Sequence, residues 1–366
     1  MRFYSDRRSP ILEETRFFSS FKMILGEVPL KTSGATCQIV HNRLYVFCGF
    51  VTVEGFPGNT NDIYCLDLVS KVWTKILPVL KNNCSELFEC DKLSSWTFKN
   101  RIYIFGGYGN PAPLNINFQN YPKHVQFCLD EPHSRGWNNQ LAVFDTQSNE
   151  LFWPKVTGEI PGPRAAMATV CDTKTKKVYL FGGRFKYQRL NDLYVGDLNP
   201  ENGNVNWNKI EENTTEISDY KPQGRSWHSM TLLENDRLLI YGGFSEAEIP
   251  LNDCWIMDLN NFTFCRMIHF EFTPRLWHTA HFIKDSSSVF LIGGCTKNIF
   301  GSDMKDYHPE KLEFLSVDPL KLSQIVMNYI AKNEEDCDIT NSLPLTLEKE
   351  ILIKRRCYMM PNDSNQ

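Results

Sequence analysis

The sequence predicts an all-β protein that folds as a β-propeller, and three observations lead to this fold class. A run of apolar, strand-forming residues that ends in a glycine pair occurs five times within the 366 residues. A second apolar strand follows each run, another precedes it, and in four copies a further strand carries an aromatic residue. Because self-similarity at a roughly constant period marks repeat architectures, the five runs predict five units that share one continuous core.

The five runs define the repeat, and they read LYVFCG (44–49), IYIFGG (102–107), VYLFGG (178–183), LLIYGG (238–243) and VFLIGG (289–294). Their last glycines stand at 49, 107, 183, 243 and 294, so the spacings are 58, 76, 60 and 51 residues. The aromatic residues of the later strand are Trp73, Trp153, Trp207 and Phe264. Four short strands in about 50 residues, with a glycine pair and a spaced aromatic, are typical of the kelch blade. An unrelated β-sandwich would not repeat the pair five times in register.

The glycine pairs have a physical reason within such a blade. Alternating apolar residues of each strand pack one blade face against the next. The glycine pair ends the second strand where a side chain would obstruct the turn or the approach of a neighbouring backbone. In the first run Cys48 replaces the leading glycine. The longest spacing contains an insertion rich in Pro and Asn, 108–138, and a loop of that length is usually functional or disordered.

The predicted domains are a remnant of a first kelch blade (1–26), the kelch β-propeller (27–318), a short α-helical box (319–354) and a flexible tail (355–366). The remnant has a strand-like stretch, TRFFSSFKMI, without a glycine pair. We therefore expect five complete blades plus an N-terminal fragment in a propeller of the six-blade type. Two arrangements remain open for ring closure. Either the last strand, LEFLSVD, helps complete the fragment, or the chain begins inside a sixth blade whose inner strands are absent, which would indicate a truncated or alternative start.

The charge and composition exclude several classes of function. Thirty-nine Lys and Arg residues against 43 Asp and Glu give a net charge of −4, so binding to nucleic acid or to an anionic membrane is not expected. No apolar run approaches the roughly 18–20 residues of a membrane span. The first ten residues lack the apolar core of a secretory signal, which favours a cytoplasmic or nuclear location. The 12 scattered cysteines, without any C-x-x-C pair, indicate buried thiols in a reducing compartment rather than disulfides.

The segment after residue 318 changes to a helical period. In PLKLSQIVMNYIAKN the apolar residues recur at three- and four-residue steps, which predicts an amphipathic helix. LPLTLEKEILIKRRC suits a second helix. Such helices either fold back against the outermost blade or present their apolar faces to another protein, and we favour the second interpretation.

Six phrases together resemble the intracellular kelch domain-containing proteins 1 and 2: HSRGWNN, PGPRAAM, GGRFKYQRLNDL, GRSWHSM, LLIYGGF and PRLWHTA. The resemblance extends from about Gly26 to about Leu352. It implies a non-catalytic, six-bladed substrate receptor of a cullin 2 ubiquitin ligase that reads the extreme C-terminus of its substrates, typically Gly-Gly. The implied partners are elongin B, elongin C, cullin 2 and substrates with C-terminal degrons, and no cofactor is implied. The chain departs from the family by lacking most of the first blade.

The resemblance also assigns the tail. The elongin-binding pattern of the family, a leucine, a small residue and an aliphatic at four-residue steps, falls on Leu322, Val326 and Ile330. The short cullin-selecting box falls on Leu343, Pro344 and Leu347, and a proline suits the start of a helix.

Arginines are the candidate ligands for a terminal carboxylate, because a planar guanidinium can donate two parallel hydrogen bonds. Arg164, Arg225 and Arg275 recur at one position of the repeat, which indicates a structural role more often than binding. Arg184 and Arg189 differ, because their loop RFKYQRLND carries three cations within six residues, unlike the equivalent loops. The resemblance carries the family's two carboxylate-binding arginines onto these two positions.

The remaining pocket residues follow from the resemblance. Lys92 and Ser226 would hydrogen-bond the peptide end, and Tyr108 and Trp137 would wall a slot that admits only glycines. An apolar pair that touches the preceding peptide residues falls on Ile299 and Phe300. Two further tryptophans repeat in register and are expected to serve blade packing, namely Trp227 and Trp277.

Two other classes of function compete with this interpretation. Catalysis is not expected, since the eight histidines form no metal-ligand set and no nucleophile–base pair is visible. His228 and His278 repeat at one blade position, which favours structure. The alternative is a non-catalytic kelch scaffold for a cytoskeletal or regulatory partner, without ligase assembly.

Overall fold

A computed structural model describes residues 25–81, 84–110, 121–211, 221–267, 273–299, 308 and 312–317. The chain divides into two compact units. The first contains the residues up to His228 together with Gly243–Ile249, and the second contains Ser229–Gly242 together with the residues from Pro250 onward. The helical box expected at 319–354, the tail at 355–366 and residues 1–24 of the expected blade remnant lie outside the described residues.

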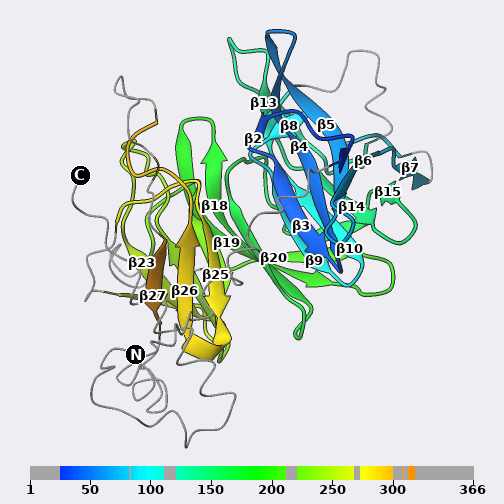
Figure 1. The fold of residues 1–366 in the computed structure, drawn as a ribbon. Coiled ribbons are helices and arrows are strands. Elements are labelled where there is room, and N and C mark those ends of the chain that lie inside the picture. Colours follow the sequence, from blue (N-terminus) through cyan, green and yellow to red (C-terminus); the bar gives the residue numbers. More distant parts are fainter. Residues whose placement is uncertain are drawn as a thin grey trace, which may run out of the picture. The chain divides into compact units, whose positions relative to one another are not determined.

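The first unit holds three blade sheets in the described residues (Figure 1). In each, four strands pair in chain order from the inner strand outward, and a short strand that precedes them in the chain pairs with the fourth at the outer edge. The first sheet consists of β1 (Leu25–Gly26), β2 (Thr32–Ser33), β3 (Thr36–Val40), β4 (Arg43–Val53), β5 (Phe56–Asp67) and β6 (Val72–Ile76). The second consists of β7 (Val79–Leu80), β9 (Ser94–Phe98), β10 (Arg101–Phe105), β14 (Leu141–Asp145) and β15 (Glu150–Phe152). The third consists of β16 (Val156–Gly158), β17 (Ala168–Asp172), β18 (Lys177–Phe185), β19 (Gln188–Leu198) and β20 (Val205–Lys209).

A small sheet built largely from the insertion completes the first unit. It is ordered β12-β13-β11-β8 and consists of β8 (Cys90–Asp91), β11 (Tyr108–Gly109), β12 (Phe127–Leu129) and β13 (Gly136–Asn138). The described parts of the insertion 108–138 thus form strands that extend the end of the second blade. Whether the insertion is functional stays a prediction.

The second unit holds two blade sheets in the part of the chain that the structure describes. The first contains β21 (Ser229–Leu232), β22 (Arg237–Tyr241), β23 (Cys254–Asp258) and β24 (Thr263–Arg266). In the second, a 3₁₀ turn at Lys284–Ser286 joins the first two strands, and the described strands are β25 (Thr279–Ile283), β26 (Ser288–Ile292) and β27 (Glu313–Ser316). All five glycine-pair runs thus form second strands of blades, which confirms the all-β fold class. The last blade shows three strands within the described residues, and the number of blades in a closed ring stays a prediction.

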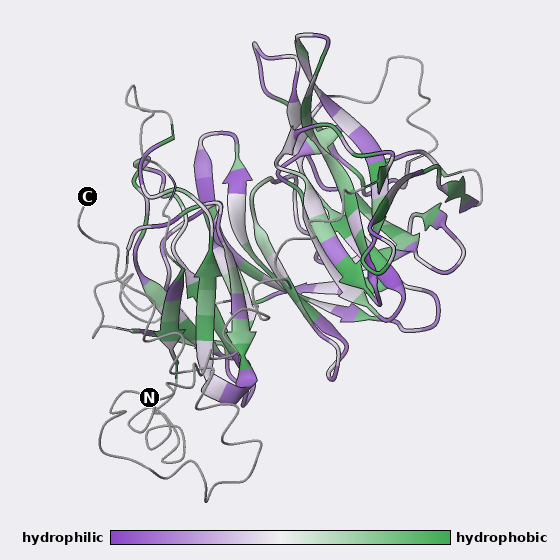
Figure 2. Cartoon of the chain, viewed as in Figure 1, coloured by the Kyte–Doolittle hydropathy of each residue, from purple (hydrophilic) through white to green (hydrophobic). Residues whose placement is uncertain are grey.

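The strands of the second blade are apolar on both faces because this blade lies between the first and the third. In β10, Ile102 and Ile104 pack with Tyr45 and Phe47 of the first sheet in one buried cluster. The residues between them point to the opposite face, since side chains alternate along a strand. Tyr103 accordingly joins a second cluster with residues of the third sheet. Figure 2 shows this as hydrophobic colour along the strands and hydrophilic colour at the loops. Each large apolar side chain buried in this way contributes about 1.5–3 kcal/mol.

The glycine pairs adopt positive φ where the next blade approaches. Gly106 and Gly107 have φ of 67° and 121°, and the Gly107 N–H donates to the carbonyl oxygen of Arg164 at 2.9 Å. A Cβ on Gly106 would lie 2.6 Å from that oxygen, closer than any side chain tolerates. The same limit applies to Gly182, where a Cβ would lie 2.8 Å from the carbonyl oxygen of Arg225. The predicted close approach of a neighbouring backbone is therefore confirmed. The strand end predicted at the same glycines is wrong for β4 and β18, which continue to Val53 and Phe185 after an irregularity in the pairing.

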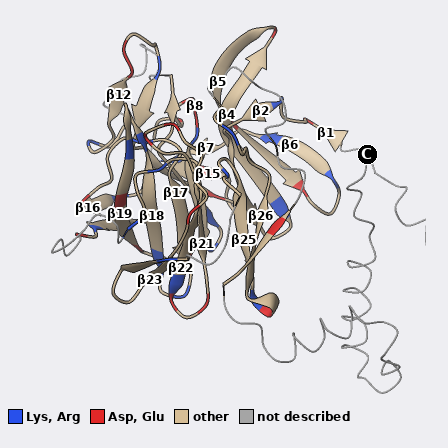
Figure 3. Cartoon of the chain, turned by 90° about the vertical axis from the view of Figure 1, so that its left-hand side faces the viewer, with Lys and Arg blue, Asp and Glu red and all other residues tan. Residues whose placement is uncertain are grey.

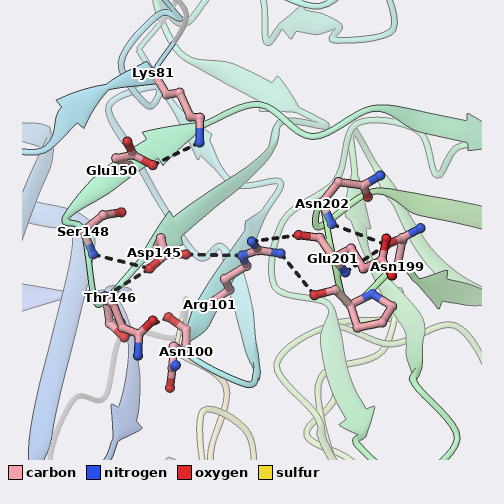
Figure 4. Close-up of polar contacts among 12 residues, drawn as sticks. Lys81, Asn100, Arg101, Asp145, Thr146, Ser148, Glu150, Asn199, Glu201 and Asn202 are labelled. Atoms are coloured by element: carbon pink, nitrogen blue, oxygen red, sulfur yellow. Dashed lines mark hydrogen bonds and ion pairs between the residues drawn. The ribbon is translucent and has the colours of Figure 1, made fainter.

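Polar contacts at the far end of the second blade tie it to a loop of the third (Figure 4). The Arg101 side chain contacts Asp145 at 3.3 Å and donates to the carbonyl oxygens of Pro200 and Glu201 at 3.5 and 3.0 Å. Asn199 holds the turn by accepting from the Glu201 N–H at 2.9 Å.

The segments that enter the blades form short parallel strands at their outer edges. β1, β7 and β16 pair with β6, β15 and β20, the fourth strands of the sheets that they lead into. Glu27 and Glu159 occupy equivalent places, since their N–H groups donate to the carbonyl oxygens of Trp73 and Trp207 at 3.0 and 2.8 Å. Their carboxylates accept from the N–H groups of Lys75 and Lys209 at 2.9 and 3.1 Å.

Candidate functional site

The site is built where the inner strands of the first unit begin. Gly34, Lys92, Ala166 and Trp227 occupy one position of the repeat, and all have positive φ, between 56° and 66°. Their backbones are linked from blade to blade. The N–H of Lys92 donates to Gly34 O at 2.7 Å, that of Ala166 to Lys92 O at 2.7 Å, and that of Trp227 to Ala166 O at 2.8 Å. This chain of bonds places Lys92 and Trp227 one blade away from Ala166 on either side.

The two singled-out arginines lie on the hairpin of β18 and β19. Its ladder continues past the glycine pair after an irregularity at Phe181–Gly183, so Arg184 and Arg189 become direct Cα partners. Arg184 also forms a β-bridge with Ala165, beside the linked backbone, and its Nε donates to Lys186 O at 2.9 Å. The structure therefore brings the two predicted arginines together.

Arg189 is buried between two aromatic rings. Only 7% of its surface is exposed, and its guanidinium carbon lies 5.8 Å from the ring centre of Trp227 and 5.6 Å from that of Phe244. Burial, and then the positive charge of Arg184, lowers the pKa of Arg189 to about 10, so the side chain remains charged at neutral pH. Within the described residues, its buried Nε has no hydrogen-bond partner.

Ser226 supplies a second buried donor next to this arginine. It precedes Trp227 in the chain and forms a β-bridge with Phe244, so its backbone adjoins the two residues whose rings flank Arg189. Ser226 is fully buried, and its Oγ has no partner among the residues that the structure describes. A buried polar group without a partner costs about 1–3 kcal/mol, and a charged one costs more. The pair of Arg189 and Ser226 therefore indicates a place for an acceptor that the described part of the chain does not provide.

The two predicted aromatic residues lie together beside Arg184, and their role as the wall of a slot stays a prediction. Tyr108 and Trp137 are Cα partners of β11 and β13, and their ring centres lie 5.0 Å apart. The Arg184 guanidinium carbon lies 6.0 Å from the Trp137 ring. Trp137 is only 2% exposed, so Tyr108 offers the more accessible ring surface. The Tyr108 hydroxyl donates to Asp130 at 2.8 Å, and burial and then Asp130 raise its pKa to about 12, which keeps the phenol neutral.

Lys92 is held by a carboxylate that sequence reasoning missed. Asp91 is 2% exposed and accepts from Lys92 Nζ at 2.5 Å and from Arg135 Nη2 at 2.8 Å. Arg135 lies over the ring of Tyr108 at 4.5 Å and over that of Phe50 at 5.1 Å. Sequence analysis could have found Arg135, because it stands two residues before Trp137 in the inserted HSRGWN segment.

The repeated arginines make structural contacts. Arg164 is buried and donates to both carboxylate oxygens of Asp192 at 2.7 and 3.0 Å. Arg275, in the second unit, lies 3.3 Å from Glu313 and donates to Gly293 O at 3.3 Å. The Arg225 Nε donates to Gln223 O at 3.1 Å.

The two repeated tryptophans behave differently from the expected packing. Trp227 is 8% exposed, but its ring lies against Arg189, so it belongs to the site as well as to the blade. Trp277, in the second unit, is 46% exposed, and the expectation that it serves blade packing is wrong for much of its surface. The difference arises because one sequence motif meets different neighbours in each blade. The two histidines at the next position are buried, as expected for a structural role.

For several predicted residues a place at this site stays a prediction. Ile299 lies in the second unit and is half-buried. The others lie outside the described residues: Phe300, Leu322, Val326, Ile330, Leu343, Pro344 and Leu347.

The described part of the chain contains neither a metal-ligand cluster nor a membrane-spanning helix. No group of three or more His, Cys, Asp or Glu side chains there is placed to hold a metal ion. No helix there is long and apolar enough to cross a bilayer. The ten cysteines of the described ranges are all free thiols. Figure 3 shows basic and acidic residues dispersed along strands and loops in that view.

Comparison with known proteins identifies relatives over most of the chain. The family model described as the KLHDC2/KLHL20/DRC7 Kelch-repeats domain matches residues 129–325. Kelch domain-containing protein 2 of Bos taurus is 32% identical over 308 residues, which cover 83% of this chain and 71% of the relative. Kelch domain-containing protein 1 of Homo sapiens is 30% identical over 335 residues, which cover 90% of this chain and 77% of the relative.

A solved structure supports the fold alone. The structure of YjhT aligns with a TM-score of 0.52 at 16% identity, covering 78% of this chain and 84% of that chain. Together with the glycine-pair blades and the sequence matches, this likeness supports an all-β kelch propeller. The chain therefore belongs to the family of kelch domain-containing proteins 1 and 2.

Proposed function

We propose that this protein is a substrate-recognition subunit of a cullin 2–elongin B/C ubiquitin ligase and binds the C-terminal ends of its substrates. The observation that carries the proposal is the cross-strand pair of Arg184 and Arg189 beside the buried donors of Arg189 and Ser226. Like charges directly opposite each other on two strands destabilise a sheet. An anion bound between them would remove that cost, and this is support for a carboxylate ligand.

The donors of the site suit a carboxylate, and the terminal carboxylate of a peptide is the one that we propose. Two guanidinium groups and one hydroxyl provide more donors than a single carboxylate needs, so both of its oxygens can be satisfied. The Arg184 side of the site also contains the half-buried ring of Tyr108 and the two cations that pair with Asp91, namely Lys92 and Arg135. A narrow aromatic wall favours residues without a Cβ, which is why an ending in Gly-Gly is proposed.

The binding step is tested with three peptides that differ only at the end. One ends in Gly-Gly as the free acid, the second is its C-terminal amide, and the third carries one added residue. We expect the free acid to bind and the other two to bind at least about 100-fold more weakly, since each lost charge-assisted hydrogen bond is worth about 1.5–3 kcal/mol. Equal affinity for the amide would mean that the site reads an internal segment, as a scaffold would.

The ligase step rests on family membership and on the sequence of the tail. Binding by the tail is proposed for the helical pattern that contains Leu322, Val326 and Ile330. A pull-down that compares recovery of elongin B, elongin C and cullin 2, with and without residues 319–366, tests it. Loss of all three on removal of the tail is expected, whereas unchanged recovery would favour a scaffold.

A further inference from the structure

The loop that follows Phe244 carries two acidic side chains next to the candidate carboxylate site. It begins at Ser245 and closes on itself within five residues. The Ser245 N–H donates to Ile249 O at 3.0 Å, and its hydroxyl accepts from the Ile249 N–H at 3.1 Å. The Glu248 N–H donates to Ser245 O at 3.1 Å, and Glu248 has a φ of 58°. Because Ser245 is buried and bonded on both sides, the turn presents Glu246 and Glu248 at fixed backbone positions.

The position of this turn relative to Arg189 is set by Phe244. The Phe244 ring contacts the Arg189 guanidinium, and Glu246 and Glu248 follow two and four residues later. Both glutamates are exposed. Their negative charges act on Arg189, whose pKa they raise against the larger lowering by burial and Arg184. All these residues belong to the first unit.

The buried donors show that a ligand end, rather than the glutamates alone, belongs at this place. Arg189 Nε and Ser226 Oγ are buried and lack partners among the described residues. If the terminal carboxylate of a peptide occupies that position, the peptide must leave the site past its rim. An extended chain advances about 3.3 Å per residue, so the third to fifth residues from the end lie about 7–15 Å from the carboxylate. That is the range in which exposed carboxylates beside the arginines influence a peptide side chain.

The charges on the opposite side of the site do not distinguish a basic from an acidic peptide. There Lys92 and Arg135 are paired with Asp91, and Asp130 accepts from the Tyr108 hydroxyl. Two cations and two carboxylates leave that side without a net charge. At the tip of the β18–β19 hairpin Lys186 is an exposed cation, and the acidic turn sets two carboxylates against it, so the turn is the described feature that would favour a basic over an acidic peptide.

We propose that Glu246 and Glu248 form a selectivity element that favours substrates with Lys or Arg three to five residues before the C-terminus and disfavours Asp or Glu there. This inference rests on the proposed function, because it assumes that a peptide carboxylate binds at Arg184 and Arg189. The glutamates act on charge and do not touch the terminus. They therefore change the relative affinity of peptides with different charge, and not the requirement for a free acid.

The test uses the whole chain and peptides that end in Gly-Gly and carry Lys, Gln or Glu at the fourth position from the end. Affinity is measured by fluorescence anisotropy for the unaltered protein, the double variant Glu246→Gln with Glu248→Gln, and the control Glu201→Gln, an exposed acid in another loop. We expect the Lys peptide to bind about five- to tenfold more tightly than the Glu peptide to the unaltered protein and to the control. In the double variant the ratio should fall below about twofold, and added salt should reduce it in the unaltered protein.

The outcomes separate this inference from the proposed function. If the Gln peptide binds as the free acid but the Lys-to-Glu ratio is the same in the double variant, the selectivity element is wrong and the carboxylate site stands. If the double variant binds all three peptides more tightly by one common factor, the glutamates compete with the terminus and do not select, which also overturns the inference. If none of the peptides binds the unaltered, folded protein, both proposals fail.

Discussion

Arg184 and Arg189 face each other as Cα partners across the β18–β19 hairpin, yet no acidic side chain forms an ion pair with either within the described residues. Arg164 in the same unit is bound by both oxygens of Asp192. The contrast separates an arginine that completes the fold from a pair without an acidic partner in the described residues, as the proposed carboxylate site requires.

Replacing either hairpin arginine by lysine should weaken binding of a Gly-Gly free acid. Lysine keeps the charge but loses the planar fork that donates two parallel bonds, so attraction alone should not restore affinity. We expect at least about a tenfold loss for Arg184→Lys or Arg189→Lys and about 100-fold or more for the double variant, measured by calorimetric titration. Arg43→Lys, at an exposed ion pair of 3.9 Å, is the matched control and should bind normally. Retained affinity in both single variants would contradict bidentate capture.

Removing the buried charge of Arg189 should not destabilise the protein. Arg189→Met keeps much of the volume between Trp227 and Phe244 while removing a desolvated cation that has no ion-pair partner in the described residues. The melting temperature should stay equal or rise, while peptide binding is lost, because the site stores a cost that only the ligand relieves. A fall of the melting temperature by several degrees, read by calorimetry, would show that Arg189 is a structural residue.

Arg164→Ala should have the opposite effect. It removes the partner of Asp192 and a hydrogen bond to Gly182 O at 3.2 Å, leaving a largely buried carboxylate uncompensated. The expected loss of unfolding free energy is about 3–5 kcal/mol, measured by denaturant titration. The matched comparison is Lys177→Ala, whose contact with Asp197 at 2.6 Å is exposed and should cost about 1 kcal/mol or less. Similar losses in the two variants would mean that Arg164 is not a buried anchor.

Acid should destabilise the second unit through His278. Burial, and then the charge of Arg275, lowers the pKa of His278 to about 3, and its Nε2 lies 2.8 Å from Ser229 Oγ. The unfolded chain binds a proton near pH 6.5 and the folded chain does not, so stability falls as the pH drops from about 6.5 towards 3. The contribution of this group is at most about 1.4 kcal/mol per pH unit. His278→Gln should flatten the dependence of the unfolding free energy on pH in that window, and an unchanged slope would exclude His278 as its source.

Leu322→Asp should abolish recovery of elongin B and elongin C while peptide binding is retained. A charged residue cannot enter an apolar groove, and burial of one leucine contributes about 1.5–3 kcal/mol. Affinity capture of the purified variant followed by immunoblotting measures the result. Ser323→Asp, which changes the neighbouring residue by the same charge, is the control. Undiminished elongin in the Leu322 variant would remove the box assignment.

Sequence alone located the blades because a blade leaves a periodic signal. The candidate residues Arg184 and Arg189 were found where their loop departs from that repeat and through the family resemblance. The glycine pairs predict where a carbonyl oxygen of the next blade approaches, since Gly106 and Gly182 must admit one. They do not fix the strand end, because β18 continues past its pair to Phe185. Repetition cannot say which neighbour a repeated side chain meets, so it predicts one role both for Trp227, which lies beside Arg189, and for the exposed Trp277.

The contacts of the insertion were hidden for a different reason. Arg135 donates to Asp91 and lies over the ring of Tyr108. Asp91 stands before the insertion and Tyr108 at its start, so no fixed spacing in the sequence links either residue to Arg135. The register of the β18–β19 hairpin likewise depends on its two-residue turn at Lys186 and Tyr187, which aligns Arg184 with Arg189 and could not be read from spacing.

The parallel strands β1, β7 and β16 have a consequence for dividing the chain. Each of these sheets ends at its outer edge in residues that precede its own inner strand, so a break in a connecting segment strips the sheet that follows of its last strand. The exposed turn at Val69 and Ser70 joins β5 to β6 of the same sheet, so it does not connect one sheet to the next. New termini introduced at that turn would leave every strand with its sheet, whereas the same cut at 77–80 or 154–158 would leave an open edge prone to association.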